Sequence, residues 1–208
     1  MKQEIGGIMQ THSIVGVGAV GSFVALNLIR LGIPFDCYDF DIVEEKNLKN
    51  QAYELAHIGL PKVEALRELC YRIDPVLTSC CTFNNCKVSS NDVKPWIGNI
   101  FLMVDSIVTR RELAQRMKKV SNIIEARLGG ESGRVLSFTP HMFDIWKETV
   151  FDPTTAHVSE CGTKKDLGFV AQHLACLALI VYKTIGTKQY INDLNYSVYN
   201  LENITYRW

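Results

Sequence analysis

The fold is decided by the stretch GVGAVG at residues 16–21, which lies between a short apolar run, His12–Val15, and a helical pattern over residues 19–31. The three glycines of this G-x-G-x-x-G sequence permit a tight turn and let the backbone approach a phosphate closely. The helix that follows offers unpaired N–H groups and the positive end of its dipole to the same anion. This stretch therefore predicts a nucleotide-binding α/β unit at the start of the chain.

A second signal is a carboxylate at the end of the next predicted strand, residues 34–39. Asp39 follows the last glycine of the turn by eighteen residues, and a carboxylate at this place accepts hydrogen bonds from both ribose hydroxyls. The turn and Asp39 fit NAD, FAD, S-adenosylmethionine or ATP. A glycine turn that only packs a helix on a strand is the less favoured alternative. The pair thus predicts an adenosine ribose and leaves the nucleotide open.

The bulk composition limits the classes of function. The 208 residues suit one α/β domain, and 47% hydrophobic residues are enough for a sizeable core. The 22 basic and 22 acidic residues balance, so neither a nucleic-acid surface nor a membrane surface is expected. Seven cysteines without an N-terminal signal peptide indicate reduced thiols and a cytoplasmic protein. The longest apolar run, residues 167–185, contains Gln172, His173 and Lys183 and is predicted to be a buried helix rather than a membrane span.

Strand and helix patterns alternate along the chain, which predicts a Rossmann-like, doubly wound and mostly parallel α/β sheet. Further strands are predicted at residues 76–83, 99–104 and 122–126, and helices at residues 61–73, 109–119 and 167–185. Residues 134–138 are predicted to return antiparallel, and runs at residues 196–199 and 204–208 to form a closing hairpin. Residues 139–165 show no clear period and are expected to form an irregular crossing segment within a single domain, residues 1–208.

Polar residues after the second strand indicate a ligand with several phosphates. Asn47 and Gln51 lie four residues apart, so on a helical turn their amides face the same side. Lys62, at a predicted helix start, can reach a phosphate as a point charge. Asp105 and Ser106 follow the fourth predicted strand, where a carboxylate lies in the ligand crevice and can hold Mg²⁺. Taken singly these are ordinary turn, surface or capping residues, but together behind the glycine turn they favour a triphosphate site.

This combination of motifs resembles the ThiF/MoeB/HesA superfamily, which includes the adenylation domains of ubiquitin-activating enzymes. The resemblance covers nearly the whole chain from His12 onward. The matching elements are the glycine turn with Ser22, Asp39-Phe40-Asp41 with Val43, Asn47 and Gln51, Pro61-Lys62-Val63-Glu64-Ala65, Ile73-Asp74-Pro75, Asp105 with Arg110, the turn and strand at residues 127–138, and the last strands at residues 196–208.

The resemblance implies an enzyme that binds Mg·ATP and adenylates the C-terminal glycine carboxylate of a ubiquitin-like carrier protein or peptide, with release of pyrophosphate. By position, Asp39 is expected to hold the ribose, Lys62 the phosphates and Asp105 the Mg²⁺, so that Lys62 and Asp105 carry the catalysis. The full set of expected nucleotide contacts is Gly16, Gly18, Ala19, Val20, Gly21, Asp39, Asp41, Asn47, Asn50, Gln51, Lys62, Asp105 and Ser106. A carboxylate that attacks an α-phosphate is repelled by it, because both groups are negatively charged. Catalysis must therefore come from positioning and charge neutralisation. The resemblance also implies a homodimer.

Two departures from the family pattern bear on turnover. The family usually has an arginine directly before the glutamine, where this chain has Asn50. A second arginine, which the family supplies from an N-terminal helix, has no candidate in residues 1–13, where Lys2 is the only lysine or arginine. A neutral amide does not replace a guanidinium, although Lys46 or Lys49 are candidates for a substitute.

These departures favour an alternative function, a degenerate family member that binds nucleotide or a protein partner without adenylating it. A third alternative, an NAD-dependent oxidoreductase, shares the glycine turn, but the sequence shows no set of residues for hydride transfer.

The cysteines separate into structural and reactive candidates. The chain has no C-x-x-C pair, so no zinc site is expected. Five are expected to be small core residues in predicted strands or helices, namely Cys37, Cys70, Cys80, Cys81 and Cys176. Cys161 lies in the irregular segment near Lys164 and Lys165, which can lower the pKa of a thiol. The resemblance implies a thioester role for Cys161, and an unreactive loop cysteine is the favoured alternative.

Overall fold

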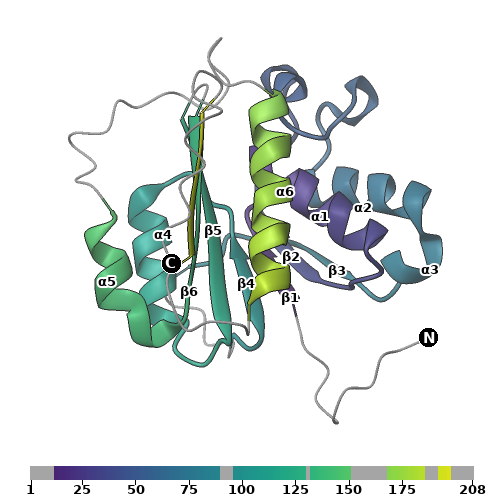
Figure 1. Ribbon diagram of the computed structural model, residues 1–208. Coiled ribbons are helices and arrows are strands. Elements are labelled where there is room, and N and C mark those ends of the chain that lie inside the picture. Colours follow the sequence, from purple (N-terminus) through teal and green to yellow (C-terminus); the bar gives the residue numbers. More distant parts are fainter. Residues whose placement is uncertain (1–11, 90–95, 130–131, 151–167, 186–191, 198–208) are drawn as a thin grey trace.

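The computed structural model describes residues 12–89, 96–129, 132–150, 168–185 and 192–197 of the chain. Seven strands in these ranges form one sheet in the order β3-β2-β1-β4-β5-β6-β7 (Figure 1). Their bounds are β1 His12–Val15, β2 Asp36–Asp39, β3 Thr82–Asn85, β4 Asn99–Leu102, β5 Asn122–Gly129, β6 Ser132–Phe138 and β7 Asn192–Ser197. The strands β1 to β5 run parallel, and β6 is antiparallel to both of its neighbours. The Rossmann-like, mostly parallel sheet with antiparallel strands toward the C-terminus is therefore confirmed.

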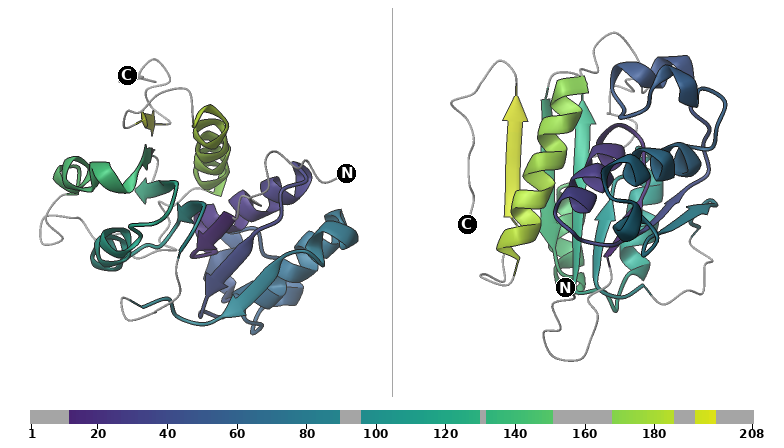
Figure 2. Two further views of the ribbon diagram at one scale, coloured as in Figure 1. Left: turned by 90° about the horizontal axis from the view of Figure 1, so that it is seen from below. Right: turned by 90° about the vertical axis from the view of Figure 1, so that its right-hand side faces the viewer.

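Helices cover both faces of the sheet. On one face lie α1 Ala19–Arg30, α2 Lys62–Ile73 and α6 Gly168–Thr184, and on the other α4 Ile107–Arg116 and α5 Phe143–Glu148 (Figures 1 and 2). The short helices are α3 Pro75–Thr78 and the 3-10 helices η1 Glu45–Lys49, η2 Leu55–His57 and η3 Pro140–Met142. None of the helices in the described ranges is long and apolar enough to span a bilayer.

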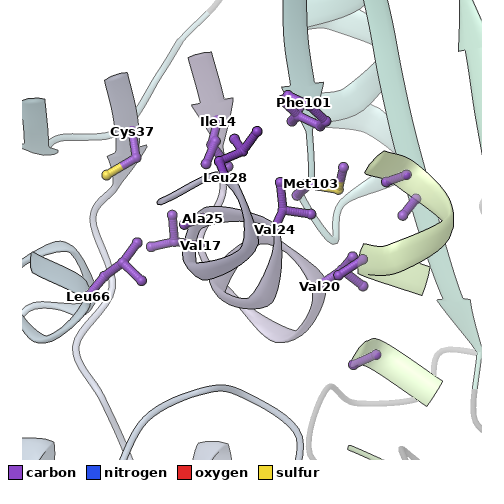
Figure 3. Packing of buried hydrophobic residues seen from close by; sticks show 14 of the residues in the cluster. Ile14, Val17, Val20, Val24, Ala25, Leu28, Cys37, Leu66, Phe101 and Met103 are labelled. Carbon is purple, nitrogen blue, oxygen red and sulfur yellow. The ribbon is translucent and has the colours of Figure 1, made fainter. Parts of the chain in front are cut away.

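The larger of the two cores lies between the sheet and the helices α1, α2 and α6. The side chains of Val20, Val24 and Leu28 recur at four-residue spacing and bury one face of α1 there, beside Phe101 of β4 (Figure 3). Burying each apolar side chain of this size contributes about 1.5–3 kcal/mol. The core therefore fixes the position of α1, and with it the position of the glycine turn.

The second core lies under α4 and α5 on the opposite face. Trp146 of α5 is fully buried and stacks on Phe138 of β6, with ring centroids 4.8 Å apart. Leu102 of β4 faces this core, whereas the preceding Phe101 faces the larger one. Because β4 is apolar on both faces, it has the character of a central strand in a parallel sheet.

The strand predicted at residues 76–83 is present as β3, but its predicted start is wrong, because α3 occupies the first part of that range and β3 begins only at Thr82. The cause is local. Asp74 Oδ1 accepts the Leu77 N–H at 2.9 Å, which caps a new helical turn with Pro75 in its first position.

The crossing segment is only partly irregular. Its first part, which was expected to lack regular structure, is helical through η3 and α5. Residues 151–167, which include Cys161, and the predicted last strand at residues 204–208 lie outside the described residues.

The thiols follow the prediction in part. Cys37 and Cys70 are fully buried, and burial raises the pKa of both, that of Cys70 to about 12. Cys80 and Cys176 are exposed and Cys81 is half-buried, so core positions are wrong for the first two. Cys80 follows α3 in a turn rather than lying in a strand, and Cys176 lies on the side of α6 that faces solvent.

Candidate functional site

Two loops meet at the point where the strand order reverses. Strand β1 lies between β2 and β4, so the loops after β1 and β4 leave the same edge of the sheet side by side. Ligands of open α/β sheets bind at this point, outside the carboxyl ends of the strands. The backbones of the two loops are joined, since the Met103 N–H donates to the Val15 carbonyl oxygen at 2.8 Å. The glycine turn after β1 and Asp105 after β4 therefore belong to adjoining strand ends.

The glycine turn is packed too closely for side chains at two positions. Gly16 has a φ of 88°, and a Cβ built on it would lie 2.8 Å from the Met103 carbonyl oxygen. A Cβ on Gly21 would overlap the Gly16 carbonyl oxygen. Only glycine fits these two contacts, which press the turn against the loop after β4 and against the first turn of α1. Gly18 differs, since a Cβ there would meet no described atom within 4 Å.

The N-terminus of α1 is open to an anion. Its N-cap is Gly18, no described side chain caps its first N–H groups, and its first turn contains no acidic residue. These N–H groups and the helix dipole form a positive end of the kind that binds phosphate. Of the predicted contacts here, Val20 offers only its backbone, because its side chain is buried in the larger core (Figure 3).

Two side chains hold the peptide groups of Val17 inside the turn. Asp39 Oδ2 accepts the Val17 N–H at 2.7 Å, and the Tyr53 hydroxyl donates to the Val17 carbonyl oxygen at 2.7 Å. Ser22 Oγ of α1 accepts the Ala52 N–H at 3.1 Å. The chain around Tyr53 therefore lies alongside the turn and fixes its shape before any ligand binds.

Asp39 retains the capacity to accept further hydrogen bonds. It is 8% exposed, its Oδ1 accepts the Asp41 N–H at 2.9 Å, and its Oδ2 accepts the Val17 N–H. Each carboxylate oxygen has a second lone pair for another donor. Burial raises the pKa of this carboxyl, against the opposing effect of the two N–H groups and Lys62. A pair of hydroxyl donors suits this group, because hydroxyls satisfy a buried carboxylate without adding a charge.

Lys62 is paired with a carboxylate in this structure. It opens α2, is 6% exposed, and its Nζ lies 2.8 Å from Asp41 Oδ2. The Lys62 N–H also donates to the Asp41 carbonyl oxygen at 2.9 Å. Because the Asp41 backbone N–H also donates to Asp39 Oδ1, the three residues form one connected group. A phosphate that reaches the Lys62 ammonium has to share it with Asp41 or displace that carboxylate.

The three amide side chains predicted to bind phosphate are all buried but differ in what they bond. Asn47 Oδ1 accepts the Glu44 N–H at 2.9 Å and so caps η1, a structural role. Among the residues that the structure describes, neither polar atom of the Asn50 amide has a partner, and Gln51 Oε1 has none. Leaving a buried polar group unpaired costs about 1–3 kcal/mol. Asn50 and Gln51 are therefore the amides with hydrogen-bonding capacity left for a ligand.

The N-terminus of α6 closes over Asn50. A Cβ built on Gly168, the first residue of α6, would overlap the Lys49 carbonyl oxygen and lie 3.4 Å from the Asn50 Cα. Two segments far apart in the sequence therefore meet at Asn50, which is 1% exposed.

Asp105 presents a carboxylate at the end of β4. It is exposed, and its Oδ1 accepts the Ser106 N–H at 2.7 Å. Ser106 is the N-cap of α4, because its Oγ accepts the Thr109 N–H at 3.2 Å, so Ser106 has a structural role here. Mg²⁺ takes one or two protein carboxylates together with phosphate oxygens and water, which an exposed carboxylate beside an anion-binding turn fits. Within the described ranges, no group of three or more His, Cys, Asp or Glu side chains is placed to hold a metal ion.

A buried ion cluster that no local sequence pattern predicts lies next to the loop that carries Asp105. Arg110 Nη1 lies 3.0 Å from Glu125 Oε2, and Arg127 Nη2 lies 2.5 Å from Glu125 Oε1. Trp146 Nε1 donates to the same carboxylate at 3.0 Å. The charged appearance of α4 suggests an exposed helix, yet Arg110 is buried. Its fixed spacing after Asp105 in the family pattern is the one signal that points to it, and no comparable signal points to Tyr53.

The fold and its switch-point site are those of the nucleotide-binding α/β class. The profile of the ThiF family matches residues 10–208, and the chain belongs to this family. Ubiquitin-like modifier-activating enzyme 5 of Caenorhabditis briggsae is 38% identical over 93 residues, which are 44% of this chain and 21% of that protein. The enzyme of the same name from Caenorhabditis elegans is 42% identical over 67 residues, 32% of this chain and 16% of that protein. The matched parts thus span about a fifth or less of these relatives.

Solved structures share the fold at low sequence identity. Escherichia coli MccB with AMPCPP and MccA gives a TM-score of 0.60 at 17% identity, over 94% of this chain and 66% of that one. The structure of PaaA gives 0.60 at 19% identity, over 95% and 62%. The E. coli tRNA N6-threonylcarbamoyladenosine dehydratase TcdA in complex with AMP gives 0.53 at 20% identity, over 84% and 88%. At these identities the likeness shows the fold.

Proposed function

We propose that this chain binds Mg·ATP and adenylates the C-terminal carboxylate of a ubiquitin-like carrier protein or peptide. The observation that carries the proposal is the uncapped N-terminus of α1 at the switch point of the sheet, together with Lys62 at the start of α2 and Asp105 in the loop after β4. Membership of the ThiF family supports it. So do two relatives named for activating a ubiquitin-like modifier, and a structural neighbour solved with AMPCPP and MccA.

The residues around the turn supply contacts for each part of ATP. Asp39 would accept the ribose hydroxyls through its free lone pairs, and the first N–H groups of α1 would bind phosphate oxygens. Lys62 would contact phosphate after it releases Asp41. The side-chain NH₂ groups of Asn50 and Gln51 would donate to phosphate oxygens, which would give the unpaired Nδ2 of Asn50 a partner.

The reaction follows from this arrangement as an in-line displacement. A carboxylate oxygen of the carrier attacks the α-phosphorus, the bond from that phosphorus to the α,β-bridging oxygen breaks, and pyrophosphate leaves with the bonding electrons. No proton transfer is needed, so the protein contributes position and positive charge. Asp105 would hold Mg²⁺, which when bound neutralises phosphate charge.

The alternative is a family member that binds nucleotide or a partner without adenylating. Two observations favour it. Position 50 carries an amide where the family usually has an arginine, and Lys62 is held by Asp41 rather than free. Both reduce the positive charge available to a triphosphate, and therefore make the site more dependent on Mg²⁺.

Further proposals rest on the resemblance rather than on the described residues. We propose a homodimer, which sedimentation at several protein concentrations would test. Cys161 lies outside the described residues and stays a prediction as a thioester-forming cysteine; a Cys161→Ser variant that still forms a reducible conjugate with the carrier would contradict it.

Trapping the product tests the adenylation proposal. The protein is incubated with Mg²⁺, ATP and a carrier that ends in Gly-Gly, and hydroxylamine is added to convert an acyl adenylate into a hydroxamate that mass spectrometry detects. Carrier hydroxamate that requires ATP supports adenylation. ATP binding without hydroxamate, with any carrier offered, would support the degenerate alternative instead.

A further inference from the structure

The buried ion cluster of Arg110, Glu125 and Arg127 is attached to the backbone directly before Asp105. Arg110 Nη1 donates to the Leu102 carbonyl oxygen at 3.0 Å, and its Nη2 donates to the Val104 carbonyl oxygen. The Arg110 backbone N–H donates to the Ser106 carbonyl oxygen at 2.9 Å. The Arg110 side chain therefore bonds two carbonyl groups of the loop that leads to Asp105, the second of them in the peptide group directly before Asp105, while its backbone bond to Ser106 belongs to the first turn of α4.

The charge balance of the cluster is not explained by stability. Glu125 is fully buried, Arg110 is 4% exposed, and the side chain of Arg127 is 13% exposed, so one carboxylate faces two guanidinium groups. A buried ion pair is often no more stabilising than apolar side chains of the same volume, because each ion loses its hydration. Burial lowers the pKa of Arg127, because the charged guanidinium loses hydration inside the protein. The cluster therefore calls for a role other than packing.

The cluster also reaches the end of α5. Arg127 Nη1 donates to the Thr149 carbonyl oxygen at 2.7 Å, and its Nη2 bonds Thr149 Oγ1 at 3.1 Å. Trp146 of α5 donates to Glu125. The loop of Asp105 and the last turn of α5 are thus linked through a single carboxylate.

We propose that Arg110 and Glu125 are positioning residues that hold the Asp105 carboxylate in the geometry needed to bind a divalent cation, with Arg127 and Trp146 fixing Glu125 from α5. The inference rests on the proposed function, because it takes Asp105 as the metal ligand. Gly16 presses on Met103 from the side of the glycine turn, and Arg110 bonds the neighbouring carbonyl groups of Leu102 and Val104. The loop is therefore held from two sides, and loosening one side displaces Asp105 relative to the phosphates.

The test measures the metal dependence of nucleotide binding by calorimetry, with α,β-methylene-ATP in EDTA and then in rising Mg²⁺. Glu125→Gln keeps the shape of the side chain and removes its charge, and Arg110→Lys keeps a charge but cannot bond both carbonyl groups. We expect nucleotide affinity in EDTA to stay within about twofold, while the Mg²⁺ concentration for half-maximal tightening rises about tenfold or more, as for other residues that orient a metal ligand. Arg72→Gln, which breaks a surface ion pair with Glu54, is the control and should change neither value.

The outcomes separate the inference from the proposed function. If Mg²⁺ does not tighten nucleotide binding in the wild type, both the inference and the proposed function are refuted. If Mg²⁺ acts through Asp105, so that Asp105→Asn abolishes the effect, but folded Glu125→Gln and Arg110→Lys retain the wild-type Mg²⁺ dependence, the positioning role alone is refuted. Melting curves identify a variant that does not fold. In that case Arg127→Gln, which removes the ion pair with Glu125 and the bonds to Thr149 but leaves the Arg110–Glu125 pair, is measured in its place. An unchanged Mg²⁺ dependence there counts against the inference.

Discussion

Replacing Asn50 by leucine is expected to stabilise the nucleotide-free protein. Asn50 is 1% exposed, and within the described residues neither polar atom of its amide has a partner. Leucine has the same branching without polar atoms, so the substitution removes unsatisfied buried groups that cost about 1–3 kcal/mol. In a protein of this size each kcal/mol shifts the melting temperature by about 2–4 °C, so we expect a rise of roughly 2–12 °C.

Asn47 provides the matched control, since it is an asparagine of similar burial three residues earlier. It is 4% exposed, but its Oδ1 accepts the Glu44 N–H at 2.9 Å. Asn47→Leu removes this cap and is expected to lower the free energy of unfolding by about 0.5–2 kcal/mol. Urea denaturation followed by circular dichroism gives both values, and the two variants should differ in sign.

The same variant tests whether Asn50 is kept for a ligand. A hydrogen bond to a charged phosphate contributes about 1.5–3 kcal/mol, so Asn50→Leu should raise the Kd for Mg·ATP by about 10- to 150-fold. The ATP-induced rise in melting temperature should shrink accordingly. The reasoning is refuted if Asn50→Leu destabilises the protein as Asn47→Leu does, or if it binds Mg·ATP with the affinity of the wild type.

Three further variants probe the turn, the core and the site. Gly21→Ala, whose Cβ would overlap the Gly16 carbonyl oxygen, should lower the free energy of unfolding by about 1–3 kcal/mol and lose the thermal shift with ATP; a normal urea midpoint would contradict this. Burial, with a smaller effect of Lys183, lowers the pKa of His12 from 6.5 to about 4. Between these values the unfolded chain binds a proton that the folded protein does not, so stability falls by about 3 kcal/mol as the pH drops from 6.5 toward 4. His12→Gln should reduce this slope in urea titrations at several pH values, and an unchanged slope would show that His12 is not its cause. Asp41→Asn frees the Lys62 ammonium from its 2.8 Å ion pair and should tighten ATP binding in calorimetry, whereas weaker binding would mean that the Asp41 charge itself is needed.

The parts of the fold that the sequence predicts well depend on short-range signals. A few neighbouring residues are enough to predict the glycine turn, the end of β2 at Asp39 and the start of α2 at Lys62. The predicted start of the third strand, at residue 76, is wrong for a reason of the same kind, because the capping by Asp74 and the preference of Pro75 for the first helical turn outweigh the apolar pattern.

The contacts that shape the site could not be predicted, because they join residues without a shared period or motif. The Tyr53 hydroxyl bonds Val17 across 36 positions, and Arg110 meets Glu125 across 15. Such contacts depend on how the strands and helices pack rather than on local pattern. Packing also decides whether a predicted polar side chain has a hydrogen-bond partner. Asn47 accepts the Glu44 N–H, whereas the Asn50 amide has no partner among the described residues.

ATP–pyrophosphate exchange tests the central claim most directly. Labelled pyrophosphate, Mg²⁺ and ATP are incubated with the wild type or with Asp105→Asn, in the presence of ubiquitin-like proteins that end in Gly-Gly or of short peptides. The account predicts that label enters ATP only when a carrier is present, and that Asp105→Asn reduces the exchange to background. Exchange absent with every carrier, while ATP still raises the melting temperature of the wild type, would contradict adenylation and leave a nucleotide-binding protein.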